Sequence, residues 1–423
     1  MVSIQFLGSA EEVGRSCILV NDKYLLDAGI KISGEGQEYP LINQFDPRQI
    51  QAVFLSHAHL DHTGALPLLN YNGLNCSIYC TKMTKKITKI LLNDSIHIEM
   101  LSATDPAYSE ENITKILSFM TIVDYKQQLK QGDISFKFLD AGHIPGSSSI
   151  LLEIDGKIIL YTGDINTLTT RLTNGMQFHK QLKQKIDVMI CESTYGDRDH
   201  SVRAETETKF IQAIKNTIKK GGKVIVPTFS VARAQELVIL LSQQNFTVPI
   251  YLDGMAKKVT DTFLSESNSI NNSSALRQAL KIVQYVKSYQ HRIDITKEQG
   301  IFITTSGMVA GGPVLDYIKF LYNDPKTAIL LTGYQAEGCN GRLLLEQQKA
   351  FIDGIGLSVK CYIEQFDFSA HAGRKDLIQV ITALQPKKLI CNHGDKESCL
   401  ALAKAIPKNI KTIVPELGEI IEI

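Results

Sequence analysis

The stretch FLSHAHLDHTGALP, residues 54–67, places three histidines and one aspartate within six positions, directly after an apolar run. Imidazole and carboxylate groups are the usual ligands of zinc and related divalent cations. His57 and His59 are two positions apart, so from a strand end they point to the same side. Asp61 and His62 are adjacent, and on a tight turn into a helix they would face a different centre. The stretch therefore predicts two metal ions rather than four unrelated polar loop residues.

One motif cannot fill two coordination shells, so further ligands are expected at other strand ends. His143 in LDAGHIPGSSS, Asp164 in ILYTGDIN and His393 in LICNHGD each follow an apolar strand and adjoin a glycine. Any one of them alone is more often a turn residue or a satisfied core residue, but the repeated arrangement favours metal binding. Asp164 could bridge both ions. Asp27, in YLLDAG, is expected behind the ligands, where it would orient a ligand histidine.

The composition is that of a globular protein, with 44% hydrophobic and 21% charged residues among 423. The formal net charge of +1 argues against loose electrostatic binding of nucleic acid, although a basic groove on a neutral body remains compatible with it. No apolar run is long enough to span a membrane, and the N-terminus does not look like a signal peptide. Eight cysteines without a paired framework predict reduced thiols in a cytoplasmic protein.

The pattern of elements changes along the chain. Strand-like runs dominate the first 190 residues, among them a hairpin with Asp155 and Gly156 at its turn. From about Asp197 helices alternate with short apolar strands, which is typical of a parallel sheet with crossover helices. The tail KTIVPELGEIIEI returns to the strand-like pattern of the first 190 residues. More than half of the chain separates Asp164 from His393, so the pattern predicts a domain inserted into another.

These motifs resemble a known family. HAHLDH reproduces the HxHxDH signature of the metallo-β-lactamase fold, and the resemblance extends over essentially the whole chain. Further motifs resemble the β-CASP ribonuclease branch, which includes the endonuclease subunit of the cleavage and polyadenylation specificity factor and its archaeal and bacterial relatives. These motifs are CESTYG with Glu192, VPTFSVARAQELVILL, LDGMAKK, TGYQAEGCNGR, FDFSAHAG with His371, and NHGD with His393.

The resemblance implies an α/β fold: an αββα metallo-β-lactamase sandwich with an inserted α/β β-CASP cap. The sandwich would comprise residues 1–196 and 368–423, and the cap residues 197–367. The resemblance also implies two Zn²⁺ ions, one bound by His57, His59 and His143 and the other by Asp61, His62 and His393, with Asp164 as the bridge.

For catalysis, the resemblance implies a zinc-dependent endoribonuclease of the cleavage-factor type. His371 would act as the general acid and Glu192 would hold its imidazole, with Asp61 and Asp164 as further catalytic carboxylates. Water, rather than the RNA 2′-hydroxyl, would be the nucleophile, so the products would carry a 5′-phosphate and a 3′-hydroxyl. As an alternative, His371 could simply support the fold.

The motifs also bear on other functions of this fold. A 5′→3′ exoribonuclease of the ribonuclease J type is an alternative, but SHAHLDHTGALP and FSAHAG favour the cleavage-factor type. A small-substrate hydrolase would leave the insertion and the Glu192–His371 pair unexplained. A diiron protein would carry a carboxylate in place of His59, and a scaffold subunit without metal would have lost ligands.

Contacts to RNA are expected in the inserted domain. Arg233 follows a strand-to-helix turn, where a helix N-terminus could receive a phosphate group. Ser306 and Gly307 belong to the glycine-rich stretch TTSGMVAGG, another candidate anion site. Lys82, Lys85, Lys86 and Lys89 share one helix face, which is either solvated or phosphate-binding. Assembly as a homodimer or within an RNA-processing complex is also expected.

Overall fold

The computed structural model describes residues 1–33, 36–101, 106–180, 182 and 184–423, which form two compact units. The first unit comprises Met1–Thr169, Thr173–Asp199 and His371–Ile423. The second comprises Thr170–Leu172 and His200–Ala370. The second unit is therefore an insertion in the sequence of the first.

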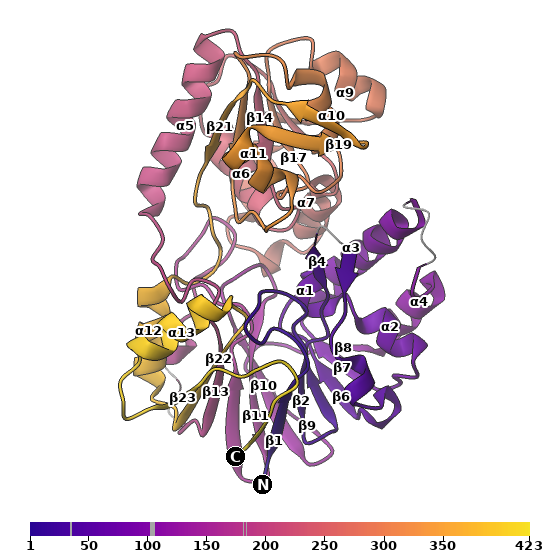
Figure 1. Ribbon diagram of the computed structural model, residues 1–423, viewed down its shortest axis with the longest axis vertical. Helices are drawn as coiled ribbons and strands as arrows, with labels where there is room; N and C mark the ends of the chain where they lie inside the picture. Colours follow the sequence, from indigo (N-terminus) through magenta and orange to yellow (C-terminus); the bar gives the residue numbers. More distant parts are fainter. Residues whose placement is uncertain (34–35, 102–105, 181, 183) are drawn as a thin grey trace. The chain divides into compact units, whose positions relative to one another are not determined.

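Two seven-stranded sheets form the middle of the first unit (Figure 1). The strands of the first sheet are, in spatial order, β24 (Ile420–Glu422), β1 (Ser3–Phe6), β2 (Ile18–Val20), β3 (Tyr24–Leu26), β6 (Ala52–Phe54), β7 (Ser77–Cys80) and β8 (Met120–Ile122). Those of the second sheet are β23 (Lys411–Ile413), β22 (Lys388–Asn392), β13 (Val188–Glu192), β12 (Lys157–Tyr161), β11 (Ser148–Ile154), β10 (Ile134–Asp140) and β9 (Gln128–Gln131). Because β1 pairs with β24, the two chain termini lie side by side (Figure 1).

The two sheets pack face to face through alternating apolar side chains. In β10 the residues Ile134, Phe136 and Phe138 are buried, and the side chains between them are partly exposed. The Phe136 ring lies 4.8 Å from the ring of Phe54, on β6 of the other sheet, in an edge-on contact. This alternation is what a sheet with one face on a core requires.

Helices cover the outer faces of both sheets. Side chains of α2 (Leu66–Tyr71) and α4 (Glu110–Phe119) pack outside the first sheet. Side chains of α12 (Arg374–Leu384) and α13 (Lys396–Ala405) pack outside the second. Strand β11 is buried at all but one position because it has neighbours on both faces. The remaining helices of this unit are α1 (Leu60–Thr63) and α3 (Lys82–Leu101), and β4 (Lys31–Ser33) pairs with β5 (Gly36–Glu38) as a hairpin.

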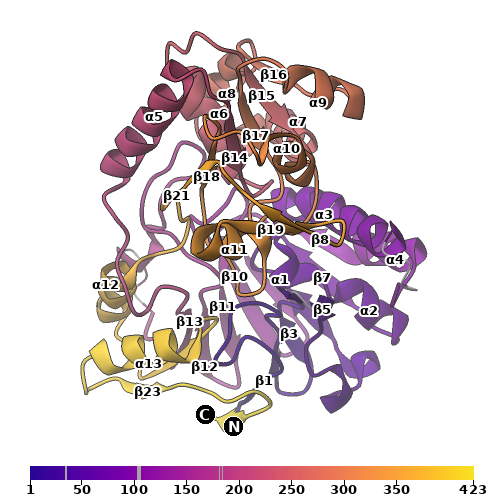
Figure 2. The same cartoon turned by 45° about the horizontal axis from the view of Figure 1, so that its top comes forward.

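The second unit contains a six-stranded sheet in which every pair of neighbours is parallel (Figure 2). Its spatial order is β16 (Val283–Tyr285), β15 (Ile250–Asp253), β17 (Ile301–Thr304), β14 (Val224–Pro227), β18 (Ala328–Leu331) and β21 (Tyr362–Gln365). The helices are α5 (Arg203–Lys219), α6 (Arg233–Ser242), α7 (Ala256–Ser265), α8 (Ser273–Ala279), α9 (Tyr289–Ile295), α10 (Val314–Leu321) and α11 (Asn340–Gln347). A separate hairpin joins β19 (Lys349–Ile352) to β20 (Ile355–Ser358).

The predicted α/β class is confirmed, as are the sandwich in the first unit and the parallel sheet in the second. The hairpin predicted at Asp155 and Gly156 joins β11 to β12. Among the described helices, none combines the length and the apolar character needed to cross a membrane.

Candidate metal centre

The ligand-type residues predicted from the opening motif lie at the end of β6, in the first sheet. The chain leaves β6 after Phe54, passes His57 and His59, and enters the short helix α1 at Leu60. Asp61 and His62 therefore lie on the first turn of α1. His57 and His62 are buried, with 1% and 0% of their surface exposed.

The other three ligand-type residues follow strands of the second sheet. His143 comes after β10, Asp164 after β12 and His393 after β22, and all three are buried. A single antiparallel bridge between Gly142 and Ile165 brings the first two together. The polar residues that follow strands of the two sheets therefore lie close together.

Four of these side chains form a first group, namely His57, His59, His143 and Asp164. His59 Nδ1 lies 3.0 Å from His57 Nε2 and 3.3 Å from His143 Nε2. Asp164 Oδ2 lies 3.5 Å from His57 Nε2 and 3.7 Å from His143 Nε2.

A second group shares Asp164 with the first and adds Asp61, His62 and His393. Asp164 Oδ2 lies 3.4 Å from His62 Nε2, and Asp164 Oδ1 lies 3.4 Å from His393 Nδ1. Asp61 Oδ2 lies 3.8 Å from His62 Nε2 and 3.6 Å from His393 Nε2. One carboxylate therefore faces both groups: its Oδ2 faces the first group and His62, and its Oδ1 faces His393.

These spacings suit divalent cations. Zinc bonds of about 2.0–2.2 Å in tetrahedral geometry separate neighbouring ligand atoms by about 3.3–3.6 Å. In addition, three buried atoms in the groups, His62 Nε2, His393 Nε2 and Asp164 Oδ1, form no hydrogen bond within the described part of the chain. Buried polar atoms normally have a partner. The residues present therefore fit a site for divalent metal.

The electrostatics of the two groups also favour binding of a divalent metal. Burial, and next the charge of His62, lower the pKa of His57 well below its usual range, which favours the neutral imidazole that binds metal. Burial would also lower the pKa of His62, but the carboxylates of Asp164 and Asp61 outweigh it and raise that pKa well above its usual range. Several carboxylates converge on a buried imidazole, so the site attracts positive charge.

Asp27, expected from the sequence to orient a histidine, is hydrogen-bonded to His62. Its Oδ2 accepts a hydrogen bond of 2.7 Å from His62 Nδ1. The same oxygen accepts from Ser56 Oγ at 2.6 Å and from Tyr161 Oη at 2.7 Å. Sequence reasoning missed Ser56 and Tyr161. Their only signals are their positions, one residue before His57 and at the last position of β12.

Gly163 allows the turn that carries Asp164 to approach Ser56. Its φ is +54°, and a Cβ atom there would lie 2.6 Å from Ser56 Cβ. Gly156, in the hairpin turn, also has a positive φ of +71°, but a Cβ atom there would meet nothing within 4 Å. Substitutions at these two glycines therefore distinguish the effect of backbone conformation, which both share, from the effect of close packing, which only Gly163 has.

We expect Gly163→Ala to destabilise the protein more than Gly156→Ala. Both substitutions incur the left-handed conformation, about 1–2 kcal/mol, and only Gly163→Ala adds overpacking of about 1–3 kcal/mol. Urea unfolding of the two variants measures the difference. Equal losses in the apparent free energy of unfolding would show that the packing of Gly163 against Ser56 has no energetic weight.

Glu192 and His371 form a pair beside the first group. Glu192 is the last residue of β13, and its Oε1 accepts a hydrogen bond of 2.6 Å from the backbone nitrogen of Ile165. Its Oε2 lies 2.9 Å from His371 Nδ1. The His371 ring lies 4.6 Å from the His143 ring, and its Nδ1 is 3.9 Å from Asp164 Oδ2.

The pair is held in place and electrostatically coupled. The backbone nitrogen of Ala372 donates 2.7 Å to the carbonyl of Ile165, which anchors the segment that carries His371. Burial opposes protonation, but the carboxylates of Glu192 and Asp164 outweigh it and raise the pKa of His371 to about 9. Because Nδ1 faces a carboxylate, it carries a proton, and a protonated His371 can also donate from Nε2.

The residues predicted to contact RNA lie in the second unit, after β14 and β17. Arg233 begins α6 and is only 8% exposed. Ser306 Oγ accepts from the backbone nitrogen of Ala310 and donates to the carbonyl of Gly311, so it shapes its own loop. Gly307 packs closely on the neighbouring loop, where a Cβ atom would lie 2.9 Å from the backbone nitrogen of Phe229.

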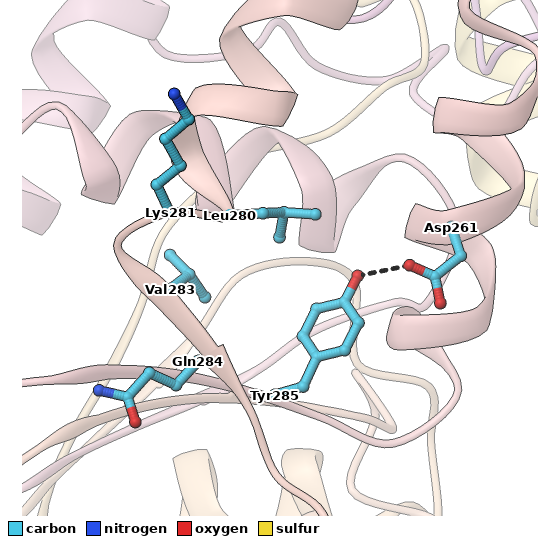
Figure 3. Close-up of a pocket in the computed structure, with 6 residues that line it drawn as sticks. All are labelled: Asp261, Leu280, Lys281, Val283, Gln284 and Tyr285. Carbon is cyan, nitrogen blue, oxygen red and sulfur yellow. Dashed lines mark hydrogen bonds between the residues drawn. The ribbon is translucent and has the colours of Figure 1, made fainter.

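A hollow of about 380 Å³ lies elsewhere on the second unit (Figure 3). Its lining residues are Asp261, Leu280, Lys281, Val283, Gln284 and Tyr285. Tyr285 Oη donates a hydrogen bond of 3.0 Å to Asp261 Oδ1 across it (Figure 3). None of the residues predicted to act in catalysis or metal binding is among these lining residues.

Comparison with known proteins agrees with this architecture. Residues 20–194 match the metallo-beta-lactamase superfamily domain, residues 234–344 the Beta-Casp domain, and residues 356–415 the Zn-dependent metallo-hydrolase RNA specificity domain. The chain is 39% identical to "Probable RNase MJ4" and 37% identical to "RNase J-like protein", both of Methanocaldococcus jannaschii, over 100% of each chain. It is 34% identical to "RNase aCSPSF2" of Saccharolobus solfataricus, over 98% of this chain and 84% of that one. The chain therefore belongs to the β-CASP ribonuclease family of the metallo-β-lactamase superfamily.

Proposed function

We propose that this protein is a two-zinc endoribonuclease of the cleavage-factor type, which hydrolyses RNA to products with a 5′-phosphate and a 3′-hydroxyl. The observation that carries the proposal is the convergence of seven ligand-type side chains, one of which is the shared carboxylate of Asp164, next to the Glu192–His371 pair. The relatives named as ribonucleases support RNA as the substrate. The proposal includes the domain division expected from the sequence, with residues 197–367 as the β-CASP domain.

In this proposal one zinc ion is held by His57, His59 and His143, the other by Asp61, His62 and His393, and Asp164 serves both. When bound, the two ions would stabilise negative charge on the phosphoryl oxygens and promote ionisation of a water molecule. The buried histidines contribute neutral nitrogen ligands, and the carboxylates contribute the negative charge that a dication requires.

His371 acts as the general acid. An oxygen–phosphorus bond forms from water while the bond from phosphorus to the 3′-oxygen breaks, and the departing 3′-oxygen takes the proton from His371 Nε2. Glu192 holds Nδ1 and stabilises the imidazolium before the transfer. Asp61, about a third of whose side chain is exposed, is positioned to accept the proton that the water releases.

The test is cleavage of a uniformly labelled RNA of defined sequence, carrying either a 5′-monophosphate or a 5′-hydroxyl. We expect discrete internal fragments with both substrates, loss of cleavage with a chelator, and recovery on addition of Zn²⁺. Cleavage that released mononucleotides from 5′-monophosphorylated RNA alone would establish the exonuclease alternative, which the "RNase J-like protein" relative favours. Absence of RNA cleavage by zinc-loaded protein would contradict the proposal. A homodimer or an RNA-processing complex remains an expectation.

A further inference from the structure

We infer that Ser56 is a positioning residue that links the two metal groups. The single carboxylate of Asp27 aligns one histidine of each group: His62 of the second group directly, and His57 of the first group through Ser56. The inference rests on the proposed two-metal function and adds to it a reason why the two groups would bind metal as a coupled pair.

The hydrogen bonds of Asp27 leave one assignment of protons. A carboxylate only accepts, so Ser56 Oγ, 2.6 Å from Asp27 Oδ2, donates its single proton to it. The hydroxyl oxygen of Ser56 can then only accept from its other neighbours. These are His57 Nδ1 at 3.1 Å and, farther away at 3.3 Å, His62 Nδ1, which lies closer to Asp27 Oδ2, at 2.7 Å. His57 therefore carries its proton on Nδ1, and the lone pair of Nε2 faces Asp164 Oδ2 and the first group.

The same argument fixes His62 directly. His62 Nδ1 lies 2.7 Å from Asp27 Oδ2 and must donate to it, so in the neutral form that binds metal the lone pair of His62 is on Nε2, which faces the second group. The rings of His57 and His62 are 4.0 Å apart between centroids. One oxygen atom, Asp27 Oδ2, thus sets the tautomer of both rings, one through a hydroxyl and one without an intermediary.

The surroundings hold this arrangement rigidly. The backbone nitrogen of Ser56 donates 2.7 Å to Asp27 Oδ1, so both carboxylate oxygens are bound to the same residue. Tyr161 Oη also donates to Oδ2. Ser16 Oγ in turn lies 3.0 Å from Tyr161 Oη. Ser16, Asp27, Ser56 and Tyr161 are at most 2% exposed. In such a dry setting an unpaired group is costly, so the network has one stable arrangement.

Removal of the Ser56 hydroxyl should lower the metal affinity of the first group only. In Ser56→Ala, His57 loses the acceptor for its Nδ1 proton, whereas His62 retains Asp27. Loss of such a supporting hydrogen bond behind a metal ligand typically lowers metal affinity 10- to 100-fold. The affinity of the first group should fall by that factor, and the affinity of the second should stay close to its original value.

The test uses Co²⁺ as a spectroscopic probe, titrated into chelator-stripped full-length protein against a competing chelator. In His393→Ala protein, where the first group is intact, adding Ser56→Ala should weaken Co²⁺ binding 10- to 100-fold. In His59→Ala protein, where the second group is intact, adding Ser56→Ala should leave the affinity unchanged. Ser56→Thr, which retains the hydroxyl, should restore binding.

Tyr161→Phe is the matched control, because it removes another hydrogen bond to Asp27 Oδ2 from an equally buried side chain that touches neither histidine. It should leave the ratio between the two affinities unchanged. The inference is overturned if Ser56→Ala weakens both groups equally, weakens neither, or is reproduced by Tyr161→Phe. If the wild-type protein binds a single ion, the two-zinc proposal fails and the inference is tested separately. In that case Ser56→Ala must still lower the affinity for Co²⁺ in the His393→Ala protein.

Discussion

Replacing His371 with alanine will lower the rate of RNA cleavage by about 10²- to 10⁴-fold, the effect expected for loss of a general acid. Metal content and RNA affinity should stay at their wild-type values, because His371 is bound to Glu192 and is not one of the seven proposed ligands. The measurements are single-turnover cleavage, metal analysis and RNA binding on the same preparation.

A chemical rescue makes this prediction specific. An RNA with sulfur in place of the 3′-bridging oxygen at the cleaved bond has a better leaving group, which needs less protonation. His371→Ala should recover much of its lost rate on this substrate, whereas His393→Ala, which should lose metal, should not. If His371→Ala lost metal, His371 would be a metal ligand, because its ligand atom lies within 4.8 Å of those of Asp164 and Glu192. If the sulfur substrate gave no rescue, another group would be the acid.

Asp164→Ala should remove both metal ions and abolish cleavage, because this carboxylate faces both groups within 3.7 Å. His393→Ala, which alters the second group alone, should leave about one ion per chain. Metal analysis after gel filtration, with cleavage assayed in parallel, provides the comparison. Asp155→Ala, in the exposed hairpin turn at the other end of β12, is the matched aspartate control and should leave both ions bound.

Two results for Asp164→Ala would contradict the shared role of this carboxylate. Full metal content in Asp164→Ala, together with normal cleavage, would mean that each group binds its ion without the common carboxylate. Retention of one ion would assign Asp164 to a single group. In either case the two groups would be independent, contrary to the proposed bridge.

Much of the centre could be predicted because its residues follow a local rule. The ligand-type side chains follow the ends of apolar strands, some within three residues and Asp61 and His62 on the short helix after β6, and a strand end can be recognised from a few neighbouring residues. The parallel sheet of the second unit was predictable for a similar reason, since its strands and helices alternate regularly along the chain. The sequence does not reveal which strand ends meet, because that depends on the order of strands in two sheets.

The supporting network could not be predicted, because its partners are far apart in sequence. Asp27 is 29 positions from Ser56 and 134 from Tyr161, and serines and tyrosines at strand ends are common in every protein. Asp27 was expected to orient a histidine, but only the folded chain identifies His62. For Arg233, the local motif suggested a helix N-terminus that could receive a phosphate group, but it gave no sign that this residue is only 8% exposed.

The most direct test of the central claim is RNA cleavage in water enriched in ¹⁸O, followed by mass spectrometry of the fragment ends. If this centre directs water at phosphorus, one ¹⁸O atom will appear in the 5′-phosphate of the downstream fragment, and the upstream fragment will end in an unlabelled 3′-hydroxyl. A 2′,3′-cyclic phosphate on the upstream fragment, with an unlabelled 5′-hydroxyl downstream, would show that the RNA 2′-hydroxyl is the nucleophile and would contradict the account.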